Sequence, residues 1–118
     1  MADYVLATPD GRQEVDLTYE GEPPHGDSYH RLCTRDRKLP GYVWGCAFAA
    51  SPCSRYLAAS WMADLYQRRT IVIDLTECAF VVLPAYLPDF TFAWPVLKGS
   101  SAVDPAYTFT GRETWISF

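Results

Sequence analysis

The residues best suited to chemistry lie in one short segment. His25, Asp27, His30 and Cys33 are spaced as His-x-Asp-x-x-His-x-x-Cys. Imidazole, carboxylate and thiolate groups are the ligands that Zn²⁺ takes in proteins, so a metal site can be drawn from them. However, the spacing fixes no fourth ligand, and the chain has no Cys-x-x-Cys pair. The alternative is a hairpin loop with two solvent-facing histidines, and we therefore predict no metal site.

Nucleophilic and acid–base sites are not indicated either. Ser28 lies near His25 and Asp27, but the members of a catalytic triad converge from separate elements of a fold. The chain has no Gly-x-Ser-x-Gly elbow and no glycine-rich phosphate loop. Asp64, Asp74 and Asp89 are scattered, and we interpret Asp74 as the polar residue of its strand. The prediction is therefore no enzyme, no catalytic residues and no cofactor.

The four cysteines are Cys33, Cys46, Cys53 and Cys78. The sequence opens on Met-Ala-Asp without the basic and apolar segments of a signal peptide, which favours a cytoplasmic protein. Cysteines in such a compartment stay reduced, and unpaired cysteines are commonly buried. Cys46, Cys53 and Cys78 lie in apolar stretches, so we expect them in the core.

The length and the turn signals predict a small protein made mainly of β-strands. The 118 residues suit one domain, 1–118, and no stretch approaches the roughly 18 apolar residues of a membrane span. Nine prolines and seven glycines are spread evenly, which leaves only short elements between them. Residues 14–19 alternate polar and apolar, and residues 70–75 are rich in β-branched side chains. The predicted strands are 4–7, 14–19, 43–50, 70–75, 79–83 and 90–94, with a terminal hairpin of 107–110 and 113–118 about Gly111 and Arg112.

Residues 54–69 allow two interpretations. Leu57, Trp61 and Leu65 are four residues apart, and Ser54 is a suitable helix cap, so a short helix is one of them. The other is a strand from Tyr56 to Trp61 followed by a loop. We favour the strand, because the surrounding sequence matches a known β pattern.

Residues 44–77 resemble one blade of a WD-repeat-type β-propeller. The matching phrases are Cys46-Ala47-Phe48, Ser51-Pro52, Arg55-Tyr56-Leu57-Ala58 and Thr70-Ile71-Val72-Ile73-Asp74-Leu75-Thr76. Cys53-Ser54 stands where such blades have Asp-Gly, and Glu77 replaces their turn glycine. A closed propeller is excluded, since even four blades of roughly 40 residues exceed this chain. The resemblance implies an antiparallel meander of propeller-blade type with flanking hairpins.

The charge of −4 is distributed unevenly. Residues 1–30 hold seven acidic residues and one arginine, whereas residues 31–38 hold four basic residues and one aspartate. Direct nucleic-acid binding normally needs a basic face, so the composition argues against it. An acidic segment can instead attract a basic partner, although a merely solvated strand face is the other interpretation.

We therefore predict a cytoplasmic protein that binds another protein. The chain resembles, in type, small acidic bacterial toxin-immunity proteins, which implies an inhibitor that occludes the active site of a basic toxin domain such as a nuclease. The alternatives are a non-catalytic scaffold or accessory subunit of a larger assembly, and a small enzyme or ligand-binding fold using His25, Asp27 and His30. For the inhibitor, the predicted contact residues are acids and tyrosines: Glu14, Asp16, Tyr19, Glu20, Glu22, Asp27, Tyr29, Asp64 and Tyr66.

Overall fold

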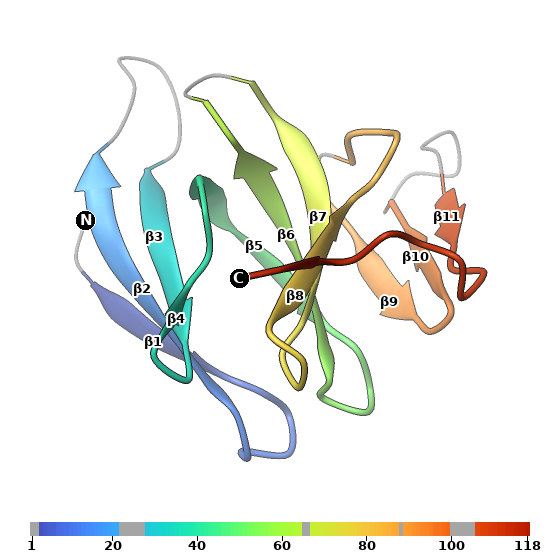
Figure 1. The fold of residues 1–118 in the computed structure, drawn as a ribbon, viewed down its shortest axis with the longest axis horizontal. Helices are drawn as coiled ribbons and strands as arrows, with labels where there is room; N and C mark the ends of the chain where they lie inside the picture. Colours follow the sequence, from blue (N-terminus) through green and yellow to red (C-terminus); the bar gives the residue numbers. More distant parts are fainter. Residues whose placement is uncertain (1–2, 22–27, 65–66, 88, 100–105) are drawn as a thin grey trace.

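The computed structural model describes residues 3–21, 28–64, 67–87, 89–99 and 106–118, apart from the side chains of residues 46 and 47. Within these residues the chain forms twelve strands and no helix (Figure 1). The mainly β prediction is therefore confirmed. The strands are β1 (Tyr4–Ala7), β2 (Glu14–Gly21), β3 (Tyr29–Thr34), β4 (Arg37–Lys38), β5 (Tyr42–Ala50), β6 (Tyr56–Met62), β7 (Arg69–Asp74), β8 (Ala79–Val82), β9 (Thr91–Ala93), β10 (Val96–Lys98), β11 (Ala106–Thr108) and β12 (Ile116–Ser117).

Nine of these strands form one antiparallel sheet. Its order is β1-β2-β3-β5-β6-β7-β8-β12, and β4 pairs with β3 beside this path. From β5 to β8 each strand pairs with the next one in the chain, which is the predicted meander. The strand β5 has an irregularity between Trp44 and Phe48, and only its first half pairs with β3.

The inner face of this sheet encloses the main core. Val15 and Leu17 on β2, Leu32 on β3, and Ile71 and Ile73 on β7 all belong to one buried cluster. Side chains of successive residues point to opposite faces of a strand, so these residues share the inner side. Since strands from both ends of the order reach the same cluster, the sheet curves around it.

A second, smaller sheet covers part of the outer face. Its order is β11-β10-β9, and Phe92 and Leu97 from it pack with Val72 and Val81 of the large sheet. The strands β6 and β7 are consequently buried on both faces, which explains their nearly continuous apolar sequences. Figure 1 shows the small sheet at one side of the molecule, next to β5–β8 and away from β1–β3.

The helix alternative for residues 54–69 is wrong. Tyr56–Met62 form β6, which pairs with β5 on one side and β7 on the other. Ser54 has a φ of 62°, so it supplies the left-handed turn residue between β5 and β6. The spacing of Leu57 and Trp61 that suggested a helix reflects burial on both faces of a central strand.

The predicted terminal hairpin is also wrong. Residues 106–108 form β11 and pair with β10, whereas residues 116–117 form β12 and pair with β8. The carboxylate of Glu113 accepts hydrogen bonds from the amides of Thr110 and Gly111 (2.9 and 3.0 Å) and from the hydroxyl of Tyr107 (2.6 Å). These bonds close a compact loop that directs the two segments to different sheets.

Asp74 organises the turn between β7 and β8. It is 5% exposed, and its carboxylate accepts hydrogen bonds from the amides of Thr76 and Glu77 at 3.0 and 3.1 Å. Arg55 donates to both carboxylate oxygens, with a shortest distance of 2.8 Å. This pairing raises the pKa of Arg55 above its ordinary value. Asp74 is thus a structural residue of its strand, as predicted.

The described residues contain no helix long and apolar enough to cross a membrane.

Candidate functional site

The outer face of β2 carries a row of acidic side chains. Val15 and Leu17 point into the core, so the residues between them point outward. Glu14, Asp16 and Glu20 are exposed on this side. The structure therefore brings together three of the predicted contact residues.

Tyr19 lies on the opposite face of the same strand. Its ring meets the ring of His30 edge to face, with centroids 5.8 Å apart, and Tyr4 meets His30 from another side at 5.0 Å. His30 itself is 1% exposed. Tyr19 is therefore partly buried with the core histidine and is not grouped with the acids. The expectation of a solvent-facing His30 is wrong.

Tyr29 belongs to the outer face, on β3. It lies opposite Gly21 of β2 and Trp44 of β5, and its ring meets Tyr42 edge to face at 5.2 Å. Gly21 allows this contact, because a Cβ there would come within 2.8 Å of the Tyr29 hydroxyl. Tyr29 remains partly exposed, next to the acidic row.

Arg31 joins the acidic row to these aromatic residues. Its Nε lies 3.4 Å from Glu20 Oε1, and its guanidinium stacks 4.2 Å from the centre of the Tyr42 ring. It also donates to the carbonyl oxygen of Gly41 and to the Tyr42 hydroxyl, both at 3.2 Å. Glu20 is consequently partly neutralised. Within the described residues, no cation lies within ion-pair distance of Glu14 or Asp16.

A basic hairpin borders the acidic row. The strands β3 and β4 are joined by Arg35 and Asp36, which both have positive φ values of 52° and 62°. Arg35 donates to the carbonyl oxygen of Thr76 at 2.8 Å, and Arg37 donates to the backbone oxygen of Phe118 at 3.0 Å. The hairpin thus spans from the acidic side of the sheet toward β8 and β12.

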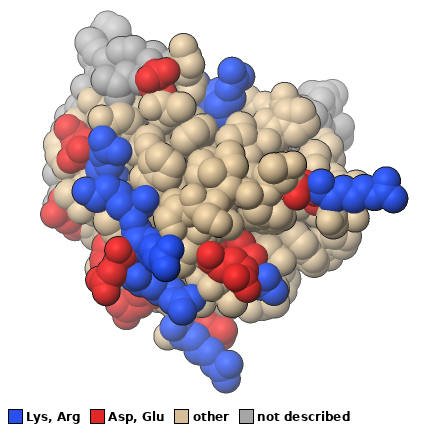
Figure 2. Space-filling model, viewed as in Figure 1, with Lys and Arg blue, Asp and Glu red and all other residues tan. Residues whose placement is uncertain are grey.

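The two signs of charge therefore form neighbouring bands. In the strand register, Asp16 of β2 lies opposite Cys33 of β3, and Cys33 lies opposite Lys38 of β4 on its other side. Figure 2 shows a stripe of Lys and Arg side chains running obliquely over the region where Figure 1 places β3 and β4, with acidic side chains along its left side. The acidic region is narrower than the sequence suggested, because basic residues adjoin it.

The other predicted contact residues lie elsewhere. Asp64 is exposed on the connection between β6 and β7, several strands from β2 in the sheet order. Glu22, Asp27 and Tyr66 lie outside the described residues. The described part of the predicted surface thus reduces to Glu14, Asp16, Glu20 and Tyr29, with Arg31 added by the structure.

The residues considered for a metal site do not converge in the described part of the chain. His30 points to the inner face of β3, whereas Cys33 is on the outer face of the same strand. The described residues contain no group of three or more His, Cys, Asp or Glu side chains arranged to hold a metal ion. His25 lies outside the described residues.

The cysteines follow the core prediction only in part. Of the cysteines expected in the core, Cys78 is buried, Cys53 is exposed, and the side chain of Cys46 lies outside the described residues, while Cys33 is intermediate. Cys53 lies in the β5–β6 turn with its sulfur 3.2 Å from the Ser51 hydroxyl oxygen, and this hydrogen bond lowers the pKa of its thiol. The turn between the strands, and not the apolar composition around it, determines this exposure.

No family model, curated protein or solved structure matches the chain.

Sequence reasoning missed the β3–β4 hairpin and with it Arg31 as a site residue. Residues 29–34 alternate between outer and buried positions in the structure, but His30 and Thr34 are buried while Tyr29 and Cys33 are outer, so the residue types do not show this alternation. The turn residues do not indicate a hairpin either, because tight hairpins of this kind usually carry Asn-Gly or Asp-Gly. Arg35-Asp36 gives no such signal.

Proposed function

We propose that the protein is a cytoplasmic, non-catalytic inhibitor that binds a toxin domain in the manner of an immunity protein. The observation that supports this proposal is the outer face of β1, β2 and β3, on which no other described part of the chain forms a second layer. The small sheet packs against Val72 and Val81, so among the described residues it covers the other half of the large sheet. Here Glu14 and Asp16 are exposed, and Tyr29 offers a partly exposed ring farther along the same face, opposite Gly21.

These residues suit a basic protein partner. Acidic side chains that lack a cation within the described residues attract a basic surface over a distance and accelerate encounter. Tyrosines supply contact area at a small entropic cost, and they are enriched at the centres of interfaces. A nuclease toxin has a basic surface because it binds phosphates, so it is the partner class that this face fits best.

The test starts from the neighbouring genes. A large secreted protein encoded directly upstream, with a variable C-terminal domain, supplies the candidate toxin domain. That domain is purified with the chain, complex formation is followed by size-exclusion chromatography, and its nuclease activity is titrated with the chain. The proposal expects a stable complex and stoichiometric loss of nuclease activity. If no complex forms and activity is unaffected, the immunity function is rejected.

Charge reversal tests the surface itself. The double variant Glu14→Lys/Asp16→Lys is expected to slow association on the order of tenfold at low salt, with a smaller effect at high salt. The single variants Glu14→Lys and Asp16→Lys are measured beside it, and Glu77→Lys is their control of equal charge change, because Glu77 is an exposed acid on the β7–β8 turn, outside this face. If the control slows association as much as the variants of the acidic row do, electrostatic inhibition is rejected. It is also rejected if no variant changes the association rate at any salt concentration, and the scaffold alternative is then favoured.

A further inference from the structure

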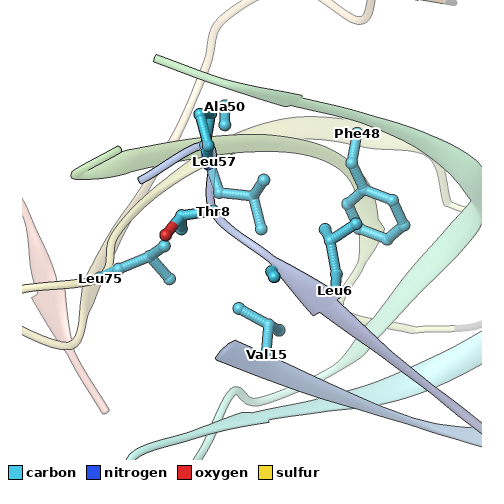
Figure 3. A pocket seen from close by; sticks show the side chains of 9 residues that line it. Leu6, Thr8, Val15, Phe48, Ala50, Leu57 and Leu75 are labelled. Carbon is cyan, nitrogen blue, oxygen red and sulfur yellow. The ribbon is translucent and has the colours of Figure 1, made fainter. Parts of the chain in front are cut away.

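An apolar cavity opens between β1 and the β5–β7 part of the large sheet. Its volume is about 250 Å³. Figure 3 shows the side chains of Leu6, Phe48, Leu57 and Leu75 around a shared space, with Val15 below them. Val15, Leu57 and Leu75 are buried, whereas the rim is more accessible. The remaining lining residues are Ala7, Thr8, Pro9 and Ala50.

The lining offers hydrocarbon contacts and no charge. Thr8 carries its one polar side-chain group, and that hydroxyl is already engaged: it donates to Asp10 Oδ1 at 2.8 Å and accepts from the amide of Gln13 at 3.2 Å. A charged or strongly polar group placed among these side chains would lose its water without gaining a partner. The chemistry therefore selects an uncharged, apolar ligand.

The turns at this end of the molecule hold the cavity in place. The amide of Asp10, in the β1–β2 turn, donates to the Ser54 hydroxyl of the β5–β6 turn at 3.1 Å. Asp10 also accepts from the Arg12 amide at 2.9 Å, which stabilises the first turn. Two connections far apart in the sequence are thereby joined, and the space between their strands is fixed in the folded chain.

The size of the cavity limits its occupant. An apolar cavity of about 150 Å³ is enough to bind benzene. This cavity is larger, so it has room for a bicyclic aromatic ring or a short alkyl chain. Ala50 lies on its wall, and one larger side chain there would fill part of the space. The native sequence leaves the space open.

We propose that this cavity binds a small, uncharged, apolar molecule, of the size of an aromatic bicycle or a short alkyl chain. This inference does not depend on the proposed inhibition, because the cavity faces the interior of the curved sheet and the acidic row faces outward. Either can fail without affecting the other.

The test uses the full chain with indole and n-hexanol as probes. Binding is measured by calorimetry, and its location by methyl-resolved NMR. We expect saturable shifts of the methyl groups of Leu6, Val15, Leu57 and Leu75, while those of Val81 and Leu97 in the second core stay unchanged. The absence of saturable shifts up to the solubility limits of both probes would overturn the proposal, as would shifts confined to the second core.

Two variants obstruct the cavity in different ways. Ala50→Phe fills it from the wall, and Leu6→Trp enlarges a partly buried side chain that already points into it. Each is expected to weaken binding on the order of tenfold, as the loss of a few buried methylene contacts would. The control is Ala93→Phe at an exposed position on β9, which is expected to leave the affinity unchanged. Wild-type affinity in a folded Leu6→Trp protein would refute the assignment.

Discussion

Replacement of Asp74 by alanine removes the carboxylate that joins the β7–β8 turn to Arg55. Two backbone amides and one guanidinium lose their acceptor. The amides belong to exposed residues, so water replaces part of each bond, and we assign about 1 kcal/mol to each. The Arg55 side chain is 43% exposed, so its ion pair is discounted to about 0.5–1 kcal/mol. The expected loss in the free energy of unfolding is therefore about 2.5–3 kcal/mol.

This loss is measurable by urea and thermal unfolding, followed by circular dichroism. For a chain of this length it corresponds to a decrease in Tm of roughly 10 °C. Asp74→Asn keeps an oxygen that accepts from the turn amides, so it is expected to cost only about 1 kcal/mol. Arg55→Ala removes the ion pair and the contact of the guanidinium with the Tyr56 ring, 5.3 Å away, but leaves the turn amides bonded, and it is expected to cost about 1 kcal/mol.

The three variants together test the reasoning. The order of cost must be Asp74→Ala first, with Asp74→Asn and Arg55→Ala well below it. If Arg55→Ala costs as much as Asp74→Ala, the ion pair and not the turn carries the stabilisation. If the free energy of unfolding of Asp74→Ala lies within about 0.5 kcal/mol of the wild-type value, the buried carboxylate at this position has no structural role.

Two further predictions concern stability. Hydrogen bonds from Tyr107 and the Thr110 amide lower the pKa of Glu113 from 4.5 to about 2, so its stabilisation is complete above pH 4.5 and is lost as the pH falls toward 2. The Tm difference between the wild type and Glu113→Gln is expected to disappear over this range, and a difference that is the same at pH 7 and pH 2 would contradict the assignment. Gly41→Ala is expected to cost more than about 2 kcal/mol in urea unfolding, because its Cβ would lie 2.6 Å from the Met62 carbonyl oxygen and 2.7 Å from Trp61 Nε1. The control is Gly11→Ala, which has a similar φ of 71° but open space around its Cβ, and it is expected to cost about 1 kcal/mol. If both variants cost the same, backbone strain at positive φ and not the close contact accounts for the loss of stability.

Local patterns predicted the strands whose side chains have a clear period or branching. Strand β2 follows its alternation and β7 its β-branched residues, and the two need no other information. Strand β3 was missed because Tyr-His-Arg-Leu-Cys-Thr has few β-branched residues and its turn lacks glycine. Pairings between distant segments, such as β12 with β8, depend on packing that no local pattern contains.

The candidate site likewise has one feature that follows from the local sequence and one that depends on long-range pairing. The grouping of Glu14 and Asp16 follows from a period of two, and the same period places Tyr19 with Val15 and Leu17 on the inner face. The sequence alone therefore separates Tyr19 from Glu14 and Asp16. The pairing of Glu20 with Arg31 was not, because it requires the register between β2 and β3, which shifts between Tyr19 and Gly21.

The outer residues of the large sheet indicate which part of it is available to a partner. At outer positions, β7 and β8 carry Val72 and Val81, and the small sheet buries them. At the corresponding outer positions, β2 carries Glu14 and Asp16, which a packed apolar layer could not cover without desolvating their charges. One curved sheet is thus divided by its outward-facing side chains into a half that completes the fold and a half that stays hydrated. A partner that binds the hydrated half must supply basic groups for these acids, and this requirement makes charge reversal at Glu14 and Asp16 the direct test of the interface.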